Sequence, residues 1–222
     1  MCCALNWSLF AEPLLLSLKV SLIASTVSLA LGIIISYWMV RHKFIGKIFL
    51  ETTIMMPLVL PPTVVGFLLL VLLGRRSWIG KAFEWITGQP IIFSWAAAVI
   101  AAIVVTFPLV YQSIKTGFSN VSLEHEEAAW LDGANEWQVL FSITLPLAKP
   151  SLITAYILGF ARALGEFGAT LMVAGNIPGR TQTIPTAIYG AVESNEMVLT
   201  WLWTLVMIHI SFVLLLLARA IK

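Results

Sequence analysis

Two oppositely charged residues, Arg162 and Glu166, lie four positions apart in an otherwise apolar stretch of the chain. On a helix this spacing places both side chains on one face, where they can form an ion pair. A single charge near the centre of a membrane helix costs about 2.5–3.5 kcal/mol to insert, so each needs a partner or water. The pair could line a path for an anion, with Arg162 attracting the solute, or it could be a buried polar lock between spans or protomers. We prefer the lock, because a strong cationic site would trap an anion rather than release it.

A glycine-rich stretch, GRRSWIGKA at 74–82, invites comparison with a phosphate-binding loop. That loop needs four residues between its glycines and a Ser or Thr after the Lys, whereas here five residues intervene and Ala82 follows Lys81. We therefore expect no nucleotide site and no cofactor bound by this chain. His125 and His209 have no companions at metal-ligand spacing, so no metal site is expected either.

The elements that must position these side chains are membrane helices. Of the 222 residues, 59% are hydrophobic and 11% are charged, whereas ordinary soluble domains are about 25% charged. Runs of about 18 or more apolar residues mark transmembrane helices. We predict a single-domain (1–222), all-α, polytopic membrane protein with five spans, at approximately 19–40, 54–73, 92–111, 152–174 and 198–218. The net charge of +2 does not indicate a nucleic-acid partner, and the adjacent Cys2 and Cys3 look incidental.

Cationic residues near the span ends predict the orientation, because Lys and Arg favour the cytoplasmic side. Arg41, Lys43 and Lys47 follow the first span, which places that loop inside. The N-terminus is then outside, the C-terminus inside, and the long loop 112–150 cytoplasmic.

Four cationic residues remain on the outer side in this topology: Arg75, Arg76, Lys81 and Arg180. Positive charge at an entrance raises the local concentration of an anion, which is one role for Arg75 and Arg76. We prefer the alternative that they contact acidic residues of a partner protein or are simply solvated.

Three prolines, Pro57, Pro61 and Pro62, interrupt the second predicted span. A proline frees a backbone carbonyl, which is tolerated at membrane depth only beside protein or a cavity. A kinked helix lining the solute path and a purely structural kink both remain open.

The loop 112–150 contains a polar segment, EEAAWLDGANEWQVLFSITLP at 126–146. Ser122 can cap a short helix and Gly133 can end it. Asn135, with Gln138 three residues later, has the pattern of a capping box that begins a second helix. We predict two short helices at a bend on the cytoplasmic face, with Pro146 and Pro150 ending the segment.

The alternative is a helix lying on lipid headgroups, which is expected to carry a basic polar face. The polar face here is acidic. Its members are Glu124, Glu126, Glu127, Asp132 and Glu136.

The same segment contains every specified residue of the pattern EAA-x3-G-x9-I-x-LP. These are Glu127, Ala128, Ala129, Gly133, Ile143, Leu145 and Pro146. The chain in this respect resembles the permease subunits of binding-protein-dependent ABC importers, in which this EAA loop forms a coupling helix that docks on a cytoplasmic ATPase. The resemblance implies a type I ABC importer permease fold. Trp137 is suited to be the aromatic anchor of the contact.

Longer stretches narrow the resemblance to the molybdate permeases. They are MPLVLPPTVVGFLLL (56–70), GRRSWIG (74–80), ARALGEFGAT (161–170) and GNIPGRTQTIPTAIY (175–189). Sulfate permeases share the GEFGA-like element and the prolines. The resemblance implies ATP-driven molybdate import across a bacterial cell membrane, with ATP and Mg bound by a separate ATPase.

The partners implied are two ATP-binding subunits and an extracytoplasmic molybdate-binding protein. A second copy of the chain is also expected, because one EAA loop without an internal repeat indicates a homodimer. The alternatives are a sulfate, thiosulfate or tungstate permease and, more remotely, an integral membrane enzyme or a passive anion channel.

Overall fold

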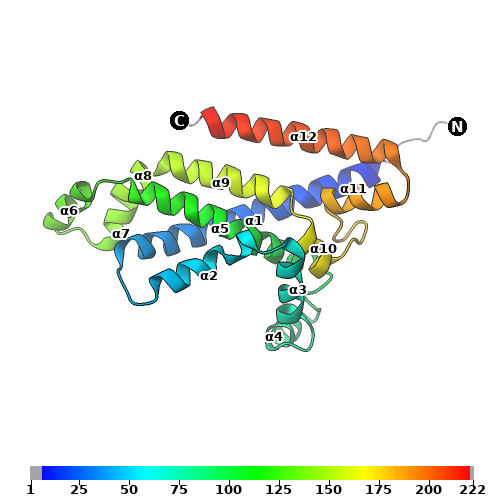
Figure 1. Ribbon diagram of the computed structural model, residues 1–222, viewed down its shortest axis with the longest axis horizontal. Helices are drawn as coiled ribbons and strands as arrows, with labels where there is room; N and C mark the ends of the chain where they lie inside the picture. The colour runs from blue at the N-terminus through cyan, green and yellow to red at the C-terminus, as the bar shows by residue number, and fades with distance from the viewer. Residues whose placement is uncertain (1–6, 221–222) are drawn as a thin grey trace.

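Long helices running along one axis form most of the molecule (Figure 1). The computed structural model describes residues 7–220, which contain helices and no strand; Cys2, Cys3 and the last two residues lie outside this part. The longest helices are α1 (Trp7–Arg41), α5 (Trp95–Ser119), α9 (Lys149–Leu164) and α12 (Met197–Ala220). The prediction of an all-α chain is confirmed.

The core lies where α5 packs against α1 and α9. Small residues let these helices approach closely. A Cβ at Gly159 of α9 would lie 2.6 Å from Val110 Cγ2, and one at Gly32 of α1 would lie 2.8 Å from Ile114 Cδ1. The close packing of α1, α5 and α9 therefore depends on positions without a side chain.

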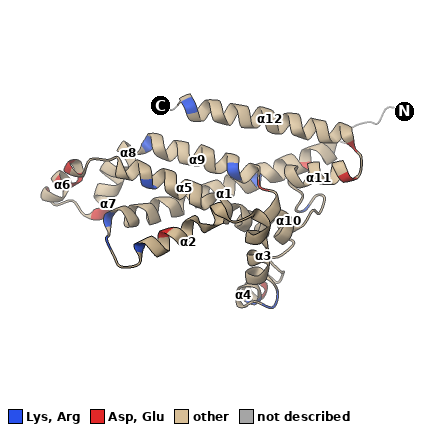
Figure 2. Cartoon of the chain, in the orientation of Figure 1, with Lys and Arg blue, Asp and Glu red and all other residues tan. Residues whose placement is uncertain are grey.

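Within residues 7–220, three helices are long and apolar enough to cross a membrane: Leu9–Arg41, Trp95–Ser119 and Met197–Ala220. They contain the predicted spans 19–40 and 198–218 and most of 92–111. Two bent helix pairs raise the number to five if each pair is one span. Figure 2 shows that the central parts of α5 and α12 carry no charged residue.

The second predicted span, 54–73, is two helices rather than one kinked helix. α2 (Lys47–Val59) and α3 (Pro62–Leu73) meet at an angle of 114°. Leu60 and Pro61 both have extended ψ values, of 142° and 136°, because a residue that precedes a proline is disfavoured in the helical region. Pro62 then occupies the first turn of α3, where its missing N–H costs nothing.

The fourth predicted span, 152–174, is also divided. α9 ends at Leu164, and α10 (Gly168–Ala174) begins after a three-residue break. Gly165 ends α9, and the buried Glu166 carboxylate accepts a hydrogen bond from the Ala169 backbone N–H of α10 at 2.9 Å. The segment 152–174 is therefore two helices rather than one, because this acidic side chain stabilises a new helix start.

The two broken segments pack against each other through α3 and α10. A Cβ at Gly168 would lie 3.0 Å from Pro62 Cβ, and a Cβ at Gly66 would lie 2.9 Å from the Ala169 backbone Cα. Both helices therefore begin at the same place, with their backbones nearly in contact.

The outer helices complete the fold. α4 (Trp78–Thr87) follows α3 and projects from the bundle, while α11 (Ile184–Glu193) lies beside the first part of α1 (Figure 1). The Ile184 backbone N–H donates to Ser17 Oγ at 2.7 Å, and Trp203 Nε1 of α12 donates to the Phe10 carbonyl at 3.1 Å. The first part of α1 therefore holds both α11 and α12.

Candidate functional site

The polar segment folds into an elbow of two short helices, residues 122–147, at one end of the bundle (Figure 1). Its first helix is α6 (Leu123–Leu131), which Ser122 caps by accepting from the Glu124 backbone N–H at 3.3 Å. After α6, Gly133 has a left-handed φ of +86°. Its N–H donates to the Trp130 carbonyl and the Ala134 N–H donates to the Ala129 carbonyl, which is a Schellman motif. The predicted start and end of this helix are confirmed.

The second arm of the elbow begins at the predicted capping box. Asn135 Oδ1 accepts from the Gln138 N–H at 2.9 Å, and Gln138 Oε1 accepts from the Asn135 N–H at 2.8 Å. α7 (Glu136–Val139) continues through a π-helical turn, η1 (Leu140–Thr144), into α8 (Leu145–Leu147).

Pro146 does not end this arm, which corrects the prediction for that residue. It occupies the first turn of α8, and the wider π turn before it suits a residue that cannot donate an i→i−4 hydrogen bond. The chain instead turns by 76° at Ala148, before Pro150 in the first turn of α9.

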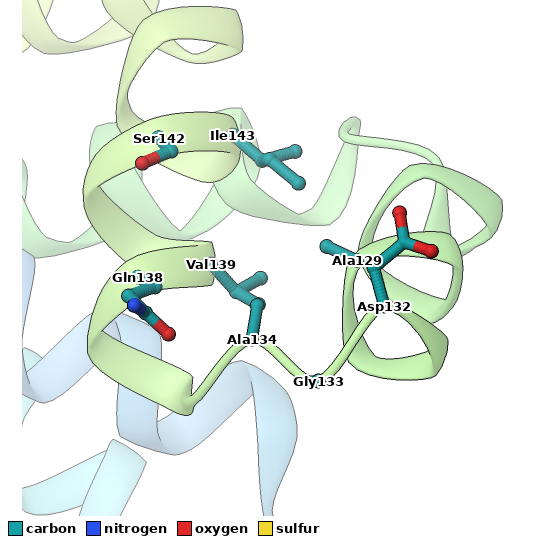
Figure 3. A pocket seen from close by; sticks show the side chains of 8 residues that line it. All are labelled: Ala129, Asp132, Gly133, Ala134, Gln138, Val139, Ser142 and Ile143. Carbon is teal, nitrogen blue, oxygen red and sulfur yellow. The ribbon is translucent and has the colours of Figure 1, made fainter.

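A hollow of about 340 Å³ separates the two arms (Figure 3). Its lining consists of Ala129, Asp132, Gly133, Ala134, Gln138, Val139, Ser142 and Ile143. Three of the EAA-pattern residues, Ala129, Gly133 and Ile143, thus face this hollow. Glu127 and Ala128 are exposed on α6, whereas Leu145 and Pro146 lie beyond the hollow in α8.

The tip of the elbow exposes large apolar side chains. Trp137 is 63% exposed and its ring stacks on that of Phe141, with centroids 6.3 Å apart. Leu131 is 90% exposed, and Trp130 is also exposed. We call Trp130, Leu131, Trp137 and Phe141 the apolar tip. Such a group on a polar end of a protein is typical of a protein–protein contact. Leu131 was not singled out from the sequence, although its position just before the Gly133 stop indicates a helix end.

A buried ion pair anchors the elbow to α1. Glu126 of α6 is fully buried, and its carboxylate pairs with the guanidinium of Arg41, the last residue of α1. Thr144 Oγ1 of η1 donates to Glu126 Oε1 at 2.6 Å. The prediction that Glu126 belongs to a polar acidic face is therefore wrong, whereas Glu124, Glu127, Asp132 and Glu136 are exposed as expected.

Arg162 and Glu166 do form the predicted ion pair. Arg162 Nη1 donates to Glu166 Oε2 at 2.7 Å, and the Glu166 side chain is buried. The pair joins the end of α9 to the start of α10 within one chain rather than lying on one continuous helix. A lock between spans or protomers and a place beside a solute path both stay predictions for this pair.

The other predicted residues lie elsewhere. Arg75 and Arg76 are exposed in the turn between α3 and α4, far from the elbow (Figure 1). Arg75 Nε lies 3.8 Å from Glu84 Oε1 of α4. Pro57 lies inside α2, and Pro61 and Pro62 form the sharp turn into α3. The structure therefore does not gather the predicted residues into one site; it separates the elbow, the broken helices and the α3–α4 turn.

Residues 28–222 match the profile of a family described as the binding-protein-dependent transport system inner membrane component. The chain belongs to this family. It is accordingly an integral membrane component of a transport system.

Permease proteins of two kinds of transport system are similar in sequence to this chain. The chain is 54% identical over 96% of its length to the putative molybdenum transport system permease protein YvgM of Bacillus subtilis, 93% of which is covered. It is 47% identical over 82% of its length to the molybdenum transport system permease protein ModB of Escherichia coli K12, 80% of which is covered. A probable sulfate transport system permease protein of Chlorokybus atmophyticus is 33% identical over 86% of the chain and 68% of that protein.

Solved structures show the same fold at low sequence identity. A bacterial ABC transporter involved in the import of alginate matches with a TM-score of 0.68 at 16% identity, over 93% of this chain and 77% of that one. The MetNI methionine ABC transporter matches with a TM-score of 0.67 at 16% identity, over all of both chains. The predicted fold, a type I ABC importer permease, is confirmed.

Proposed function

We propose that this chain is the membrane-spanning permease subunit of an ATP-driven molybdate importer. The observation that carries the proposal is the difference in identity between named relatives. Two molybdenum permeases are 54% and 47% identical to the chain, and the sulfate permease is 33% identical. The difference favours molybdate over sulfate as the solute.

The elbow is the part of the chain that contacts the ATPase. A separate ATPase, which binds ATP and Mg, docks on the apolar tip and on the hollow between the two arms. Large exposed aromatic residues are effective anchors of such a contact. Because residues 7–220 form one elbow, two copies of the chain assemble with two ATPases, and each elbow holds one ATPase.

The topology follows from the same assignment. The elbow end lies in the cytoplasm of a bacterial cell, together with Arg41, Lys43 and Lys47, which agrees with the preference of cations for that side. The N-terminus and α4 then lie outside, where an extracytoplasmic molybdate-binding protein delivers the anion. Arg75 and Arg76 are available there to contact that protein or to attract its cargo.

The broken helices suit a solute path. Two predicted spans are interrupted, one at Leu60–Pro61 and the other at Gly165–Phe167, and the helices that follow the breaks, α3 and α10, pack together. Interrupted helices near the middle of a membrane are a common feature of transporters. Alternating access would then move α3 and α10 relative to their counterparts in the second copy.

The test is reconstitution of the permease, its ATPase and its binding protein in vesicles that contain ATP-regenerating reagents on the ATPase side. We expect uptake of radioactive molybdate that requires ATP and the binding protein. Excess unlabelled molybdate should compete fully and excess sulfate weakly. Uptake that sulfate abolishes and molybdate does not would assign the chain to sulfate instead, and uptake without ATP would indicate a channel.

A further inference from the structure

The buried pair of Arg41 and Glu126 joins elements that are remote in the sequence. Arg41 donates to Glu126 Oε1, and Thr144 Oγ1 donates to the same oxygen. Arg41 Nη2 also lies 3.4 Å from Thr144 Oγ1. One carboxylate thus connects the end of α1, the middle of α6 and the π turn η1.

Aromatic rings enclose the guanidinium of Arg41. Its Cζ lies 5.0 Å from the centre of the Tyr37 ring and 5.7 Å from the centre of the Trp130 ring, both suitable cation–π distances. The Tyr37 hydroxyl donates to the Glu136 carbonyl at 3.1 Å, which adds α7 to the joined elements. The last turn of α1 therefore contacts both arms of the elbow.

The opposite end of α1 is fixed to other helices. Ser17 Oγ accepts from the Ile184 N–H at the start of α11, and the Phe10 carbonyl accepts from Trp203 Nε1 of α12. α1 has 35 residues, so at 1.5 Å per residue it is about 50 Å long. It connects the elbow to the far end of the molecule through polar contacts at both of its ends.

We infer that Arg41, Glu126 and Thr144 are positioning residues that make the elbow and α1 move as one body. The inference rests on the proposed function, because it concerns how the ATPase acts on the rest of the permease. An ion pair with several hydrogen bonds holds a defined geometry, whereas apolar contacts alone allow sliding. A displacement of the elbow by the ATPase is then transmitted along α1 to α11 and α12, where the binding protein is expected to act.

Glu126→Gln is the central variant, because it removes the charge and keeps the size of the side chain. Glu124→Gln is the matched control, since Glu124 is an exposed residue of the same helix and, within residues 7–220, the hydrogen-bond and ion-pair partners of the Arg41 side chain are Glu126 and Thr144. Thr144→Val removes one hydrogen bond from the same carboxylate and is a milder second variant if Glu126→Gln fails to assemble.

The first readout is the number of molybdate ions transported per ATP hydrolysed in the reconstituted importer. We expect this ratio to fall about fivefold or more in Glu126→Gln, the range of a typical coupling free energy, with ATP hydrolysis persisting. Thr144→Val should give a smaller fall and Glu124→Gln none. A purely structural role predicts instead that hydrolysis and transport decline together at a constant ratio, and that result would overturn the inference.

The second readout does not require a transported solute. Spin labels at Ile34 of α1 and Leu123 of α6, both exposed, report the separation of the two helices, with Cys2 and Cys3 replaced and one labelled copy in each dimer. We expect the same narrow distance distribution in the nucleotide-free and ATP-trapped complexes, and a broader one in Glu126→Gln.

A shift of about one helical turn, near 5 Å, between the two nucleotide states of the unmodified permease would show that the elbow moves independently of α1. Such a result would refute the inference that the elbow and α1 move as one body, even if molybdate import is established. Conversely, if molybdate uptake fails but the distance between the two spin labels is the same in both nucleotide states, the proposed solute is refuted and the inference that the elbow and α1 move as one body is supported.

Discussion

Replacing Gly133 tests whether the backbone of the elbow, rather than the side chain at this position, determines docking of the ATPase. Gly133 has φ +86°, and a Cβ at this position would meet no atom of the chain within 4 Å. A substitution therefore causes no clash inside the permease, and its cost is the left-handed conformation itself. For Ala this cost is about 1–2 kcal/mol. Asn, which visits this region more readily, should cost less, and the β-branched Val should cost more.

The conformational cost of each Gly133 substitution should lower the affinity of the permease for the ATPase. A loss of about 1–2 kcal/mol lowers the ratio of native to non-native elbow by a factor of about 5–30. Because we propose that the ATPase binds only the native elbow, its apparent affinity should fall by up to this factor, and by the full factor where the native elbow is the minor population. We expect the order Gly, Asn, Ala, Val from tightest to weakest, measured by titrating ATPase onto immobilised permease in detergent.

The comparison of Asn with Ala decides between backbone and steric explanations. Asn is the larger side chain, so a collision with the bound ATPase would make Asn weaker than Ala. The conformational argument predicts the reverse order. Binding of Gly133→Ala that equals that of the unmodified permease, or exceeds that of Gly133→Asn, would refute the reasoning.

The other predictions concern packing, docking and the intramembrane pair. Gly159→Ala should destabilise the permease by about 1–3 kcal/mol, because the new methyl group overpacks against Val110. Adding Val110→Ala to the same chain should recover part of the lost stability, as measured by thermal unfolding in detergent. If the second substitution recovers none of the lost stability, the contact between these two residues is contradicted. Trp137→Ala should weaken ATPase binding by about 2 kcal/mol or more without lowering the unfolding temperature, and an unchanged affinity would exclude it as an anchor. Arg162→Gln should cost about 3–5 kcal/mol of stability, because it leaves the buried Glu166 carboxylate unpaired. Glu166→Gln should cost less, because the Arg162 side chain is 32% exposed and therefore less enclosed by the chain than that of Glu166, which is 2% exposed; the opposite order would contradict the assignment.

Local signals in the sequence predicted the elbow well. The cap at Ser122, the stop at Gly133 and the capping box at Asn135 each depend on residues within a few positions of one another, so a helix start or end can be predicted from composition and spacing. The role of Glu126 could not be predicted in this way. Its partner, Arg41, lies 85 positions away, and an acidic residue in a polar segment looks exposed until the tertiary contact is known.

The broken helices mark a second limit of sequence analysis. Hydropathy is continuous across 152–174, so the break after Leu164 leaves no trace in an average over the window. Its local signal is a glycine followed by an acidic residue that caps the next helix. At Pro61 and Pro62 the prolines predicted a kink, but the 114° angle depends on how α3 packs against α10.

The central claim is that the elbow is where a cytoplasmic ATPase holds this permease. A photo-crosslinking amino acid at Leu131 of the elbow, compared with one at Trp78 of α4, tests the claim most directly, because both positions are 90% exposed. In the assembled importer we predict that Leu131 crosslinks to the ATPase and that Trp78 does not. Crosslinking of the ATPase at Trp78, with none at Leu131, would contradict both the docking site and the orientation of the chain.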